Sequence, residues 1–206
     1  MFGGSLMAKS KKGESDWWSN EAKRLGYPAR SVFKLKEIND KFHVFAKPEK
    51  VLDVGAAPGS WTQFISREIL KGKGHVVACD LNSLSIPVEG TNITEVVGDA
   101  FCEENQRKIL SLAPFDAVVS DAAPHTIGNR SVDCQRSLEI AESMASLSDK
   151  ALGVGGNLVF KMYQGNETAE LVKSLRKKFA KVSIFKPECS RSTSFECFVV
   201  AIGKKG

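Results

Sequence analysis

The chain has 206 residues, enough for one domain with a full hydrophobic core, and carries a net charge of +5. Its composition, with 42% apolar and 26% charged residues, is that of an ordinary globular protein. No apolar run approaches the roughly 20 residues needed to cross a bilayer, and the segment before Met7 is too short for a signal peptide, so we expect no membrane-spanning segment and no leader.

Positive charge is concentrated in two segments. Residues 1–36 carry a net charge of +5 and residues 173–191 a net charge of +6. Two basic clusters on an otherwise acidic-to-neutral body indicate a polyanionic partner such as RNA, although either cluster alone is as well explained by solvated surface.

The cysteines form no recognisable metal or disulfide pattern. They are scattered, lack a CxxC pair and have no histidine at ligand spacing: Cys79, Cys102, Cys134, Cys189 and Cys197. This usage predicts free thiols in a reducing, cytoplasmic compartment, with no structural metal. Nothing in the sequence indicates an oligomer, and we expect a monomer.

The N-terminal part is predicted to hold a tail and two helices. Residues 1–15 are rich in Lys, Ser and Gly and lack periodicity, which predicts a disordered basic tail ahead of one domain over residues 16–206. Asp16 is suited to cap a short helix that runs to Lys23, and apolar residues at helical spacing predict a second helix over residues 29–42.

From Lys50 onward, short β-branched runs alternate with helical stretches. The predicted strands are Val51–Val54, His75–Cys79, Ile93–Val97, Ala117–Ser120, Asn157–Met162, Val182–Phe185 and Phe195–Ala201. The predicted helices are Trp61–Lys71, Glu103–Leu112, Val132–Ala151 and Glu167–Phe179. This alternation predicts an α/β fold with a mostly parallel seven-stranded sheet and helices on both faces. Because only a short segment separates the last two strands, they should form an antiparallel pair at the sheet edge.

The first predicted strand continues directly into a glycine-rich loop. Glycines permit a tight turn and close contact between ligand and backbone, and a proline suits the first turn of a helix. The loop lacks both the GxGxxG pattern of a dinucleotide site and the GK[ST] ending of a P-loop. It therefore suits a nucleoside cofactor without phosphate, S-adenosylmethionine, bound by Gly55, Ala56, Ala57, Pro58, Gly59 and Trp61.

Three acids follow the ends of successive strands. Asp80 ends the second strand and is suited to accept hydrogen bonds from ribose hydroxyls. Asp99 follows the third strand and is suited to hold the adenine amine, and Asp121 ends the fourth. We place Leu81 and Ala100, their neighbours in the chain, in the same site. Any one of these acids alone is more often a cap or turn residue, but three after such a loop favour a cofactor site.

Two charged residues occur in otherwise apolar strands. Lys161 lies within a run that should form a central strand, and Glu196 lies near the start of the last strand. Charged side chains are rarely buried unless they are paired. An outward-facing position on an edge strand is a reasonable alternative for Glu196 and a weaker one for Lys161. With Lys34 and Asp121 the two residues would form a nearly neutral cluster.

The sequence resembles the FtsJ/RrmJ family of ribose 2′-O-methyltransferases over roughly residues 20–203. The matching stretches are residues 31–35, 53–59, 78–81, 120–124, 160–165 and 190–196. The resemblance implies a Rossmann-like S-adenosylmethionine-dependent methyltransferase fold and an active-site tetrad of Lys34, Asp121, Lys161 and Glu196. Ser60 and His125 depart from the residues that are usual in close relatives, and His125 lies in the substrate-side loop, residues 124–130.

The resemblance also implies a substrate class. Compact members of the family methylate a uridine of large-subunit ribosomal RNA, and related members act on tRNA anticodon loops or mRNA caps. A small-molecule methyltransferase and a non-catalytic RNA-binding assembly factor are the alternatives from other classes. The tetrad argues against both, and the two basic clusters argue against the first.

The expected reaction is an in-line displacement in which a ribose 2′-oxygen attacks the sulfonium methyl group. The protein would mainly position two reactants, because the methyl donor is already activated. Lys161 is the candidate that assists the 2′-hydroxyl, either as a neutral general base or as a cation that stabilises the developing negative charge. The sequence leaves both roles open.

Overall fold

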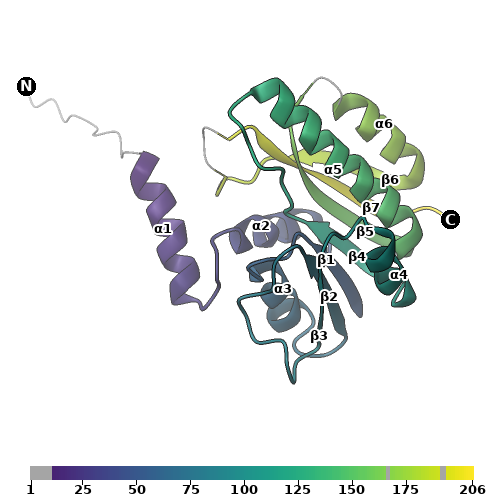
Figure 1. The fold of residues 1–206 in the computed structure, drawn as a ribbon, viewed down its shortest axis with the longest axis horizontal. Coiled ribbons are helices and arrows are strands. Elements are labelled where there is room, and N and C mark those ends of the chain that lie inside the picture. Colours follow the sequence, from purple (N-terminus) through teal and green to yellow (C-terminus); the bar gives the residue numbers. More distant parts are fainter. Residues whose placement is uncertain (1–10, 166–167, 191–193) are drawn as a thin grey trace, which may run out of the picture.

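The computed structural model describes residues 11–165, 168–190 and 194–206. The strands are β1 Lys50–Val54, β2 His75–Asp80, β3 Ile93–Val97, β4 Phe115–Ser120, β5 Leu152–Tyr163, β6 Phe179–Phe185 and β7 Glu196–Lys204. The helices are α1 Lys11–Arg24, α2 Val32–Phe42, α3 Ser60–Phe64, its π-helical continuation Ile65–Ile69, α4 Glu103–Ser111, α5 Arg130–Ala151 and α6 Thr168–Lys178. Figure 1 shows one sheet with helices packed along it.

The described residues form a seven-stranded sheet in the order β3-β2-β1-β4-β5-β7-β6. The first five strands in this order pair in parallel, whereas β7 runs antiparallel to both β5 and β6. The predicted mostly parallel sheet with an antiparallel last strand is therefore confirmed. Because β1 to β5 are parallel, their carboxyl ends meet at one edge of the sheet, where ligands bind in folds of this kind.

Successive residues along the central strands belong to two different hydrophobic clusters. Val51 packs in one cluster with helices α1, α2 and α3, and Leu52 packs in the other with α4, α5 and α6. This division follows from the strand geometry, since neighbouring side chains point to opposite faces. Both faces of the sheet are thus covered, which explains why the central strands read as continuous apolar runs.

Two elements begin five residues earlier than predicted. Helix α1 begins at Lys11 rather than Asp16, because Lys and Glu favour a helix and outweigh one glycine, which costs about 1 kcal/mol. Residues 1–10 of the predicted tail lie outside the described residues. Strand β5 begins at Leu152, five residues before the predicted Asn157, because an irregularity in its pairing with β4 accommodates the glycines there.

Candidate active site

The glycine-rich loop lies at the carboxyl edge of the sheet and is tied to the neighbouring strand. The N–H groups of Gly55 and Ala56 both donate to the carbonyl oxygen of Cys79, at 2.8 and 3.2 Å. Gly98, after β3, donates to the carbonyl oxygen of Asp80 at 2.7 Å. These backbone bonds bring together the ends of β1, β2 and β3, as the sequence predicted for the cofactor residues.

Gly55 occupies a position that only glycine can fill. Its φ of +72° is in the left-handed region, and an added Cβ would lie 2.6 Å from the Cβ of Ala122, with the backbone of Ala122 at 2.8 Å. The loop therefore passes directly against the segment that follows Asp121. This close approach joins the loop to the residue that the sequence places in the tetrad.

Two of the three acids predicted for the cofactor site also hold the backbone around them. Asp80 accepts from the N–H of Ala57 at 3.0 Å and from the N–H of Asn82 at 2.9 Å. Asp99 is exposed and accepts from the N–H of Phe101 at 2.9 Å, so one of its oxygens is a turn acceptor. A carboxylate has about four acceptor sites, which leaves capacity on both for a ligand.

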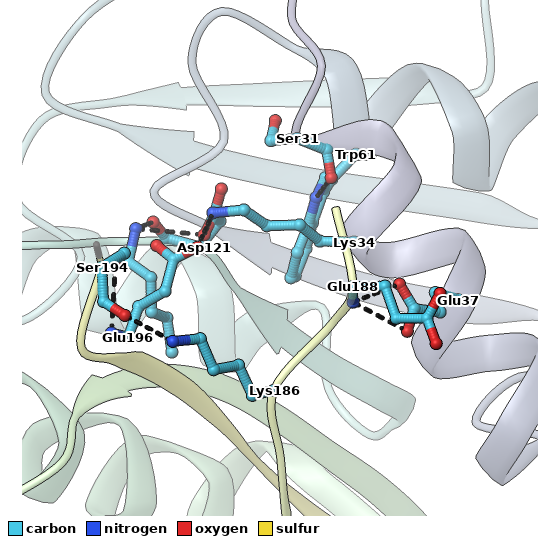
Figure 2. Close-up of polar contacts among 10 residues, drawn as sticks. Ser31, Lys34, Glu37, Trp61, Asp121, Lys186, Glu188, Ser194 and Glu196 are labelled. Carbon is cyan, nitrogen blue, oxygen red and sulfur yellow. Dashed lines mark hydrogen bonds and ion pairs between the residues drawn. The ribbon is translucent and has the colours of Figure 1, made fainter. Parts of the chain in front are cut away.

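The remaining predicted cofactor residues divide into exposed and buried ones. The side chain of Leu81 is 70% exposed beside Asp80, whereas Ala56 and Ala100 are buried. Trp61 is buried as well, and its indole N–H donates to the carbonyl oxygen of Ser31 at 2.8 Å (Figure 2). Its side chain thus packs beneath α2, in the same buried cluster as Ala56.

A second hydrogen bond, besides that from Trp61 to Ser31, joins the glycine-rich loop to the start of α2. The N–H of Ala29 donates to the hydroxyl oxygen of Ser60 at 2.7 Å. Together with the bond from Trp61 to Ser31, it fixes the start of α2 against the first turn of α3. Lys34 lies in the first turn of α2, so the position of its side chain depends on the glycine-rich loop.

One buried acid in the glycine-rich motif is missing from the predicted set. Asp53 is 1% exposed, accepts a hydrogen bond of 2.6 Å from the hydroxyl of Thr62 and has an Oδ1 atom without a partner among the described residues. Burial raises its pKa to about 7, with a further contribution from the carboxylates of Asp121 and Asp80, although the Thr62 hydrogen bond opposes it. A charged residue within an otherwise apolar strand was the signal in the sequence that could have identified Asp53. The same signal identified Lys161.

The raised pKa of Asp53 makes stability depend on pH. Between about pH 4 and 7 the folded protein holds a proton on this carboxyl group that the unfolded chain has lost, so the free energy of unfolding should fall as pH rises through this window. The decrease in the free energy of unfolding should reach at most about 4 kcal/mol, and the Asp53→Asn variant should not show it. Urea denaturation of both proteins at several pH values measures it, and parallel pH curves would contradict the assignment.

Four charged side chains from four elements meet at the carboxyl edge (Figure 2). Lys161 Nζ lies 3.0 Å from Asp121 Oδ1, and Lys34 Nζ lies 2.9 Å from Glu196 Oε1 and 3.7 Å from Asp121 Oδ1. Lys161 Nζ also donates to the backbone carbonyl oxygen of Asp121. The four side chains are only 10 to 18% exposed. The structure therefore gathers the whole predicted tetrad into one largely buried network.

Pairing outweighs burial at one end of this network. Burial alone would lower the pKa of Lys34, but the carboxylates of Asp121 and Glu196 raise it above the usual range. Burial would raise the pKa of Glu196, but the Lys34 ammonium group lowers it below the usual range. Lys34 and Glu196 therefore stay charged near neutral pH and hold each other in place.

The segment before β7 is fastened to α2 and to itself. The N–H of Glu188 donates to both carboxylate oxygens of Glu37, at 3.0 and 2.9 Å, and Lys186 Nζ donates to the carbonyl oxygen of Ser194 at 2.6 Å (Figure 2). Glu37 lies one turn after Lys34. The same helix thus supplies Lys34 and anchors the segment that leads to Glu196.

Three further properties concern metal ions, membranes and the cysteines. The part of the chain that the structure describes contains no group of three or more His, Cys, Asp or Glu side chains placed to hold a metal ion. None of its helices combines the length and apolar character that a membrane span requires. All five cysteines are free thiols, and burial raises the pKa values of Cys79 and Cys189 to about 12.

The comparisons with known proteins agree with this geometry. The family profile of the FtsJ-like methyltransferases matches residues 27–204. A ribosomal RNA large subunit methyltransferase E from Treponema denticola is 42% identical over 97% of this chain and 100% of its own length, and one from Nitratidesulfovibrio vulgaris is 41% identical over 93% of this chain and 94% of its own. The crystal structure of a ribosomal RNA methyltransferase from Plasmodium falciparum matches with a TM-score of 0.76 and 28% identity, covering 87% of this chain and all of that one. The chain therefore belongs to the FtsJ-like methyltransferase family.

Proposed function

We propose that this protein transfers a methyl group from S-adenosylmethionine to a ribose 2′-hydroxyl of large-subunit ribosomal RNA, a uridine in the first instance. The observation that carries the proposal is the buried network of Lys161, Asp121, Lys34 and Glu196 directly beside the glycine-rich loop. The names of the curated relatives support ribosomal RNA as the substrate. The cytoplasm is the compartment we propose, on the free cysteines and the ribosomal substrate.

The residues at the carboxyl edge fit the proposed cofactor. The backbone of the loop at Gly55 leaves no room for a side chain, Asp80 and Asp99 retain acceptor capacity, and Leu81 offers an exposed apolar side chain to the adenine. The bound cofactor would supply a methyl group on a sulfonium centre. The protein would hold the adenosine of the cofactor through the carboxylates of Asp80 and Asp99.

Asp80→Ala is expected to weaken cofactor binding by at least tenfold, because a charge-assisted hydrogen bond contributes about 1.5–3 kcal/mol. Isothermal titration with S-adenosylmethionine measures the affinity. Asp40→Ala, which removes an exposed acid of α2 paired with Lys36, is the matched control and should bind normally. Unchanged affinity in Asp80→Ala would exclude the ribose contact.

The contacts of Lys161 favour a charged role. Its Nζ forms an ion pair with the Asp121 carboxylate, 3.0 Å from Oδ1, and donates to the backbone carbonyl oxygen of the same residue. We therefore assign Lys161 as the cation that positions the 2′-oxygen and stabilises its developing negative charge. The oxygen gains a bond to the methyl carbon as the carbon–sulfur bond breaks, and the hydroxyl proton is released to water. Lys34 and Glu196 hold Asp121 and the substrate side of the site in place.

Glu37 is a positioning residue for this network. Glu37→Ala removes both acceptors of the Glu188 N–H and is expected to lower kcat roughly tenfold, with the affinity for S-adenosylmethionine unchanged. Glu188→Ala is the matched control, because it keeps the backbone N–H and loses only an exposed side chain. Activity should return in part with Glu37→Gln, which keeps one carbonyl oxygen. Equal kcat values for Glu37→Ala and Glu188→Ala would show that Glu37 does not position the network.

Exposed basic side chains support an RNA substrate. Helix α6 buries Leu171 and Leu175 and leaves its lysines and arginine on the solvent side: Lys173, Arg176, Lys177 and Lys178. Contacts between cations and phosphates make RNA affinity fall steeply with salt. We propose a single methyltransferase domain over residues 16–206, with helix α1 beginning before it. We also propose that the protein acts as a monomer.

One experiment separates the functional alternatives. The protein is incubated with tritiated S-adenosylmethionine and, separately, with large ribosomal subunits, naked ribosomal RNA, tRNA, capped mRNA and small acceptors. Label at a 2′-O-methyl uridine of the large-subunit RNA is the expected result. Label in another RNA would change the substrate, label in a small acceptor would change the class, and no label in any acceptor would favour a non-catalytic RNA-binding protein.

A further inference from the structure

A row of three side chains leads away from the tetrad toward the start of α5. Tyr163, the last residue of β5, pairs with Glu196 across the sheet, and its ring contacts that of Phe195 edge to face, with 4.6 Å between the centroids. The guanidinium group of Arg130 lies over the Phe195 ring, 5.5 Å from its centroid. The row therefore joins Glu196 of the tetrad to the first residue of α5.

Beyond Arg130 lies a groove of about 1030 Å³ between α5 and the end of β5. Among the described residues its lining is largely polar and carries no acidic side chain, with Arg130, Ser131, Cys134, Gln135, Gln164 and Gly165 among them. The two sides of the groove are joined by the Ser137 hydroxyl, which accepts from the N–H of Tyr163 at 2.9 Å, and by the Cys134 thiol, which donates to the carbonyl oxygen of Gln164 at 3.7 Å. These bonds fix the end of β5 against α5, so the groove is a built feature of the fold.

Arg130 is available to a ligand. It is exposed, and no ion pair joins it to a carboxylate among the described residues. One face of its planar guanidinium group lies over Phe195, and the residue is otherwise exposed. Such a group stacks on a nucleobase through its face and binds a phosphate through its edge. The neighbouring carboxamides of Gln135 and Gln164 can donate to and accept from the edge of a base.

We propose that this groove binds the nucleotide adjoining the methylated one, with its base stacked on Arg130 and its phosphate at the guanidinium edge. The proposal rests on the proposed function, because the target ribose must reach Lys161 and Asp121 and its neighbour in the RNA chain must then pass over adjoining surface. The row from Glu196 through Phe195 to Arg130 is one such path. Neither basic cluster of the sequence includes Arg130. The groove is thus a specificity site for the RNA, separate from the cationic surface of α6.

The first test compares two arginines of α5. Arg130→Ala is expected to raise the KM for RNA roughly tenfold, as the loss of a stacked base and a phosphate contact should, with kcat at saturating RNA and cofactor affinity unchanged. Arg136→Ala removes an equally exposed charge outside the groove and should leave the KM for RNA near that of the wild type. Arg130→Lys keeps the charge without the planar group and should recover only part of the loss. Equal KM values for Arg130→Ala and Arg136→Ala overturn the proposal.

The second test identifies the nucleotide. After the methylated position has been mapped, two substrate RNAs are made with an abasic residue immediately 5′ or 3′ of it. One of the two should raise the KM of the wild-type enzyme roughly tenfold and have no further effect on Arg130→Ala, because both changes remove the same contact. If both abasic RNAs affect the wild type and Arg130→Ala by equal factors, the groove does not hold that nucleotide.

Binding without turnover separates this proposal from the proposed function. The affinity of fluorescently labelled large-subunit RNA fragments is measured by anisotropy for wild type, Arg130→Ala and Arg136→Ala, with no methyl donor present. A weaker affinity in Arg130→Ala alone supports the groove even for a protein that methylates no RNA. Equal affinities for the two variants overturn the groove even for an active methyltransferase.

Discussion

Replacing Lys161 with alanine is expected to lower kcat for methyl transfer by roughly 100- to 1,000-fold, the usual effect of removing one group that stabilises charge in a transition state. Lys161 Nζ is held by two oxygens of Asp121 in a site where its side chain is 10% exposed. In such a water-poor position its charge acts strongly on a nearby oxygen. The acids proposed to hold the adenosine, Asp80 and Asp99, lie at the ends of β2 and β3, away from β5, so the affinity for S-adenosylmethionine should change little.

Two comparisons make this result specific. Lys161→Arg keeps a cation that cannot act as a base near neutral pH, so measurable activity in this variant supports the electrostatic role and its complete loss favours a general base. Lys150→Ala, in the last turn of α5, removes an exposed lysine of the chain and should be fully active. Circular dichroism establishes that all variants are folded. Wild-type turnover by Lys161→Ala on the mapped RNA would exclude the residue from the reaction.

Replacing Gly55 with alanine is expected to reduce the free energy of unfolding by about 2–4 kcal/mol and to abolish cofactor binding. Two causes add: the strain of a left-handed backbone with a side chain costs about 1–2 kcal/mol, and the new methyl group must displace Ala122. The displaced segment follows Asp121 directly, so the loop and the tetrad should both move. Thermal denaturation and isothermal titration measure the two effects.

Gly90→Ala is the matched control for Gly55→Ala. Gly90 has nearly the same φ, +73°, but an added Cβ would have no atom within 4 Å. Gly90→Ala should therefore show only the backbone cost and bind the cofactor normally. If the two variants lose equal stability and both bind the cofactor, the close approach of Gly55 to Ala122 is not needed for cofactor binding.

The sequence predicted the fold well because its dominant signals are local. Alternating strand and helix patterns and the short connection before the last strand are visible within windows of a few residues, and each reflects backbone geometry. Boundaries were less well predicted, as the start of α1 at Lys11 and the long β5 show. There, pairing across the sheet and propensity over a whole helix decide where an element begins.

Part of the site could also be predicted. Parallel strands bring their carboxyl ends to one edge, so Gly55, Asp80, Asp99 and Asp121 had to lie near one another once the strands were assigned. Trp61 is grouped with them by its position in the loop, and only the structure shows that its ring packs under α2 with the indole N–H bonded to Ser31. Neighbours in sequence need not point the same way, and only packing decides which face a side chain takes.

By itself, the sequence determined the α/β class, the order of the elements, the cofactor loop and the four charged residues that the family resemblance placed in one site. Only the tertiary structure decided how those charges pair, with Lys161 on Asp121 and Lys34 on Glu196. It alone gave the bond from Glu188 to Glu37, across 151 positions of the chain. Local patterns carry the geometry of a strand or a helix. Contacts between distant segments depend on how the finished elements pack, and no short window of the sequence records them.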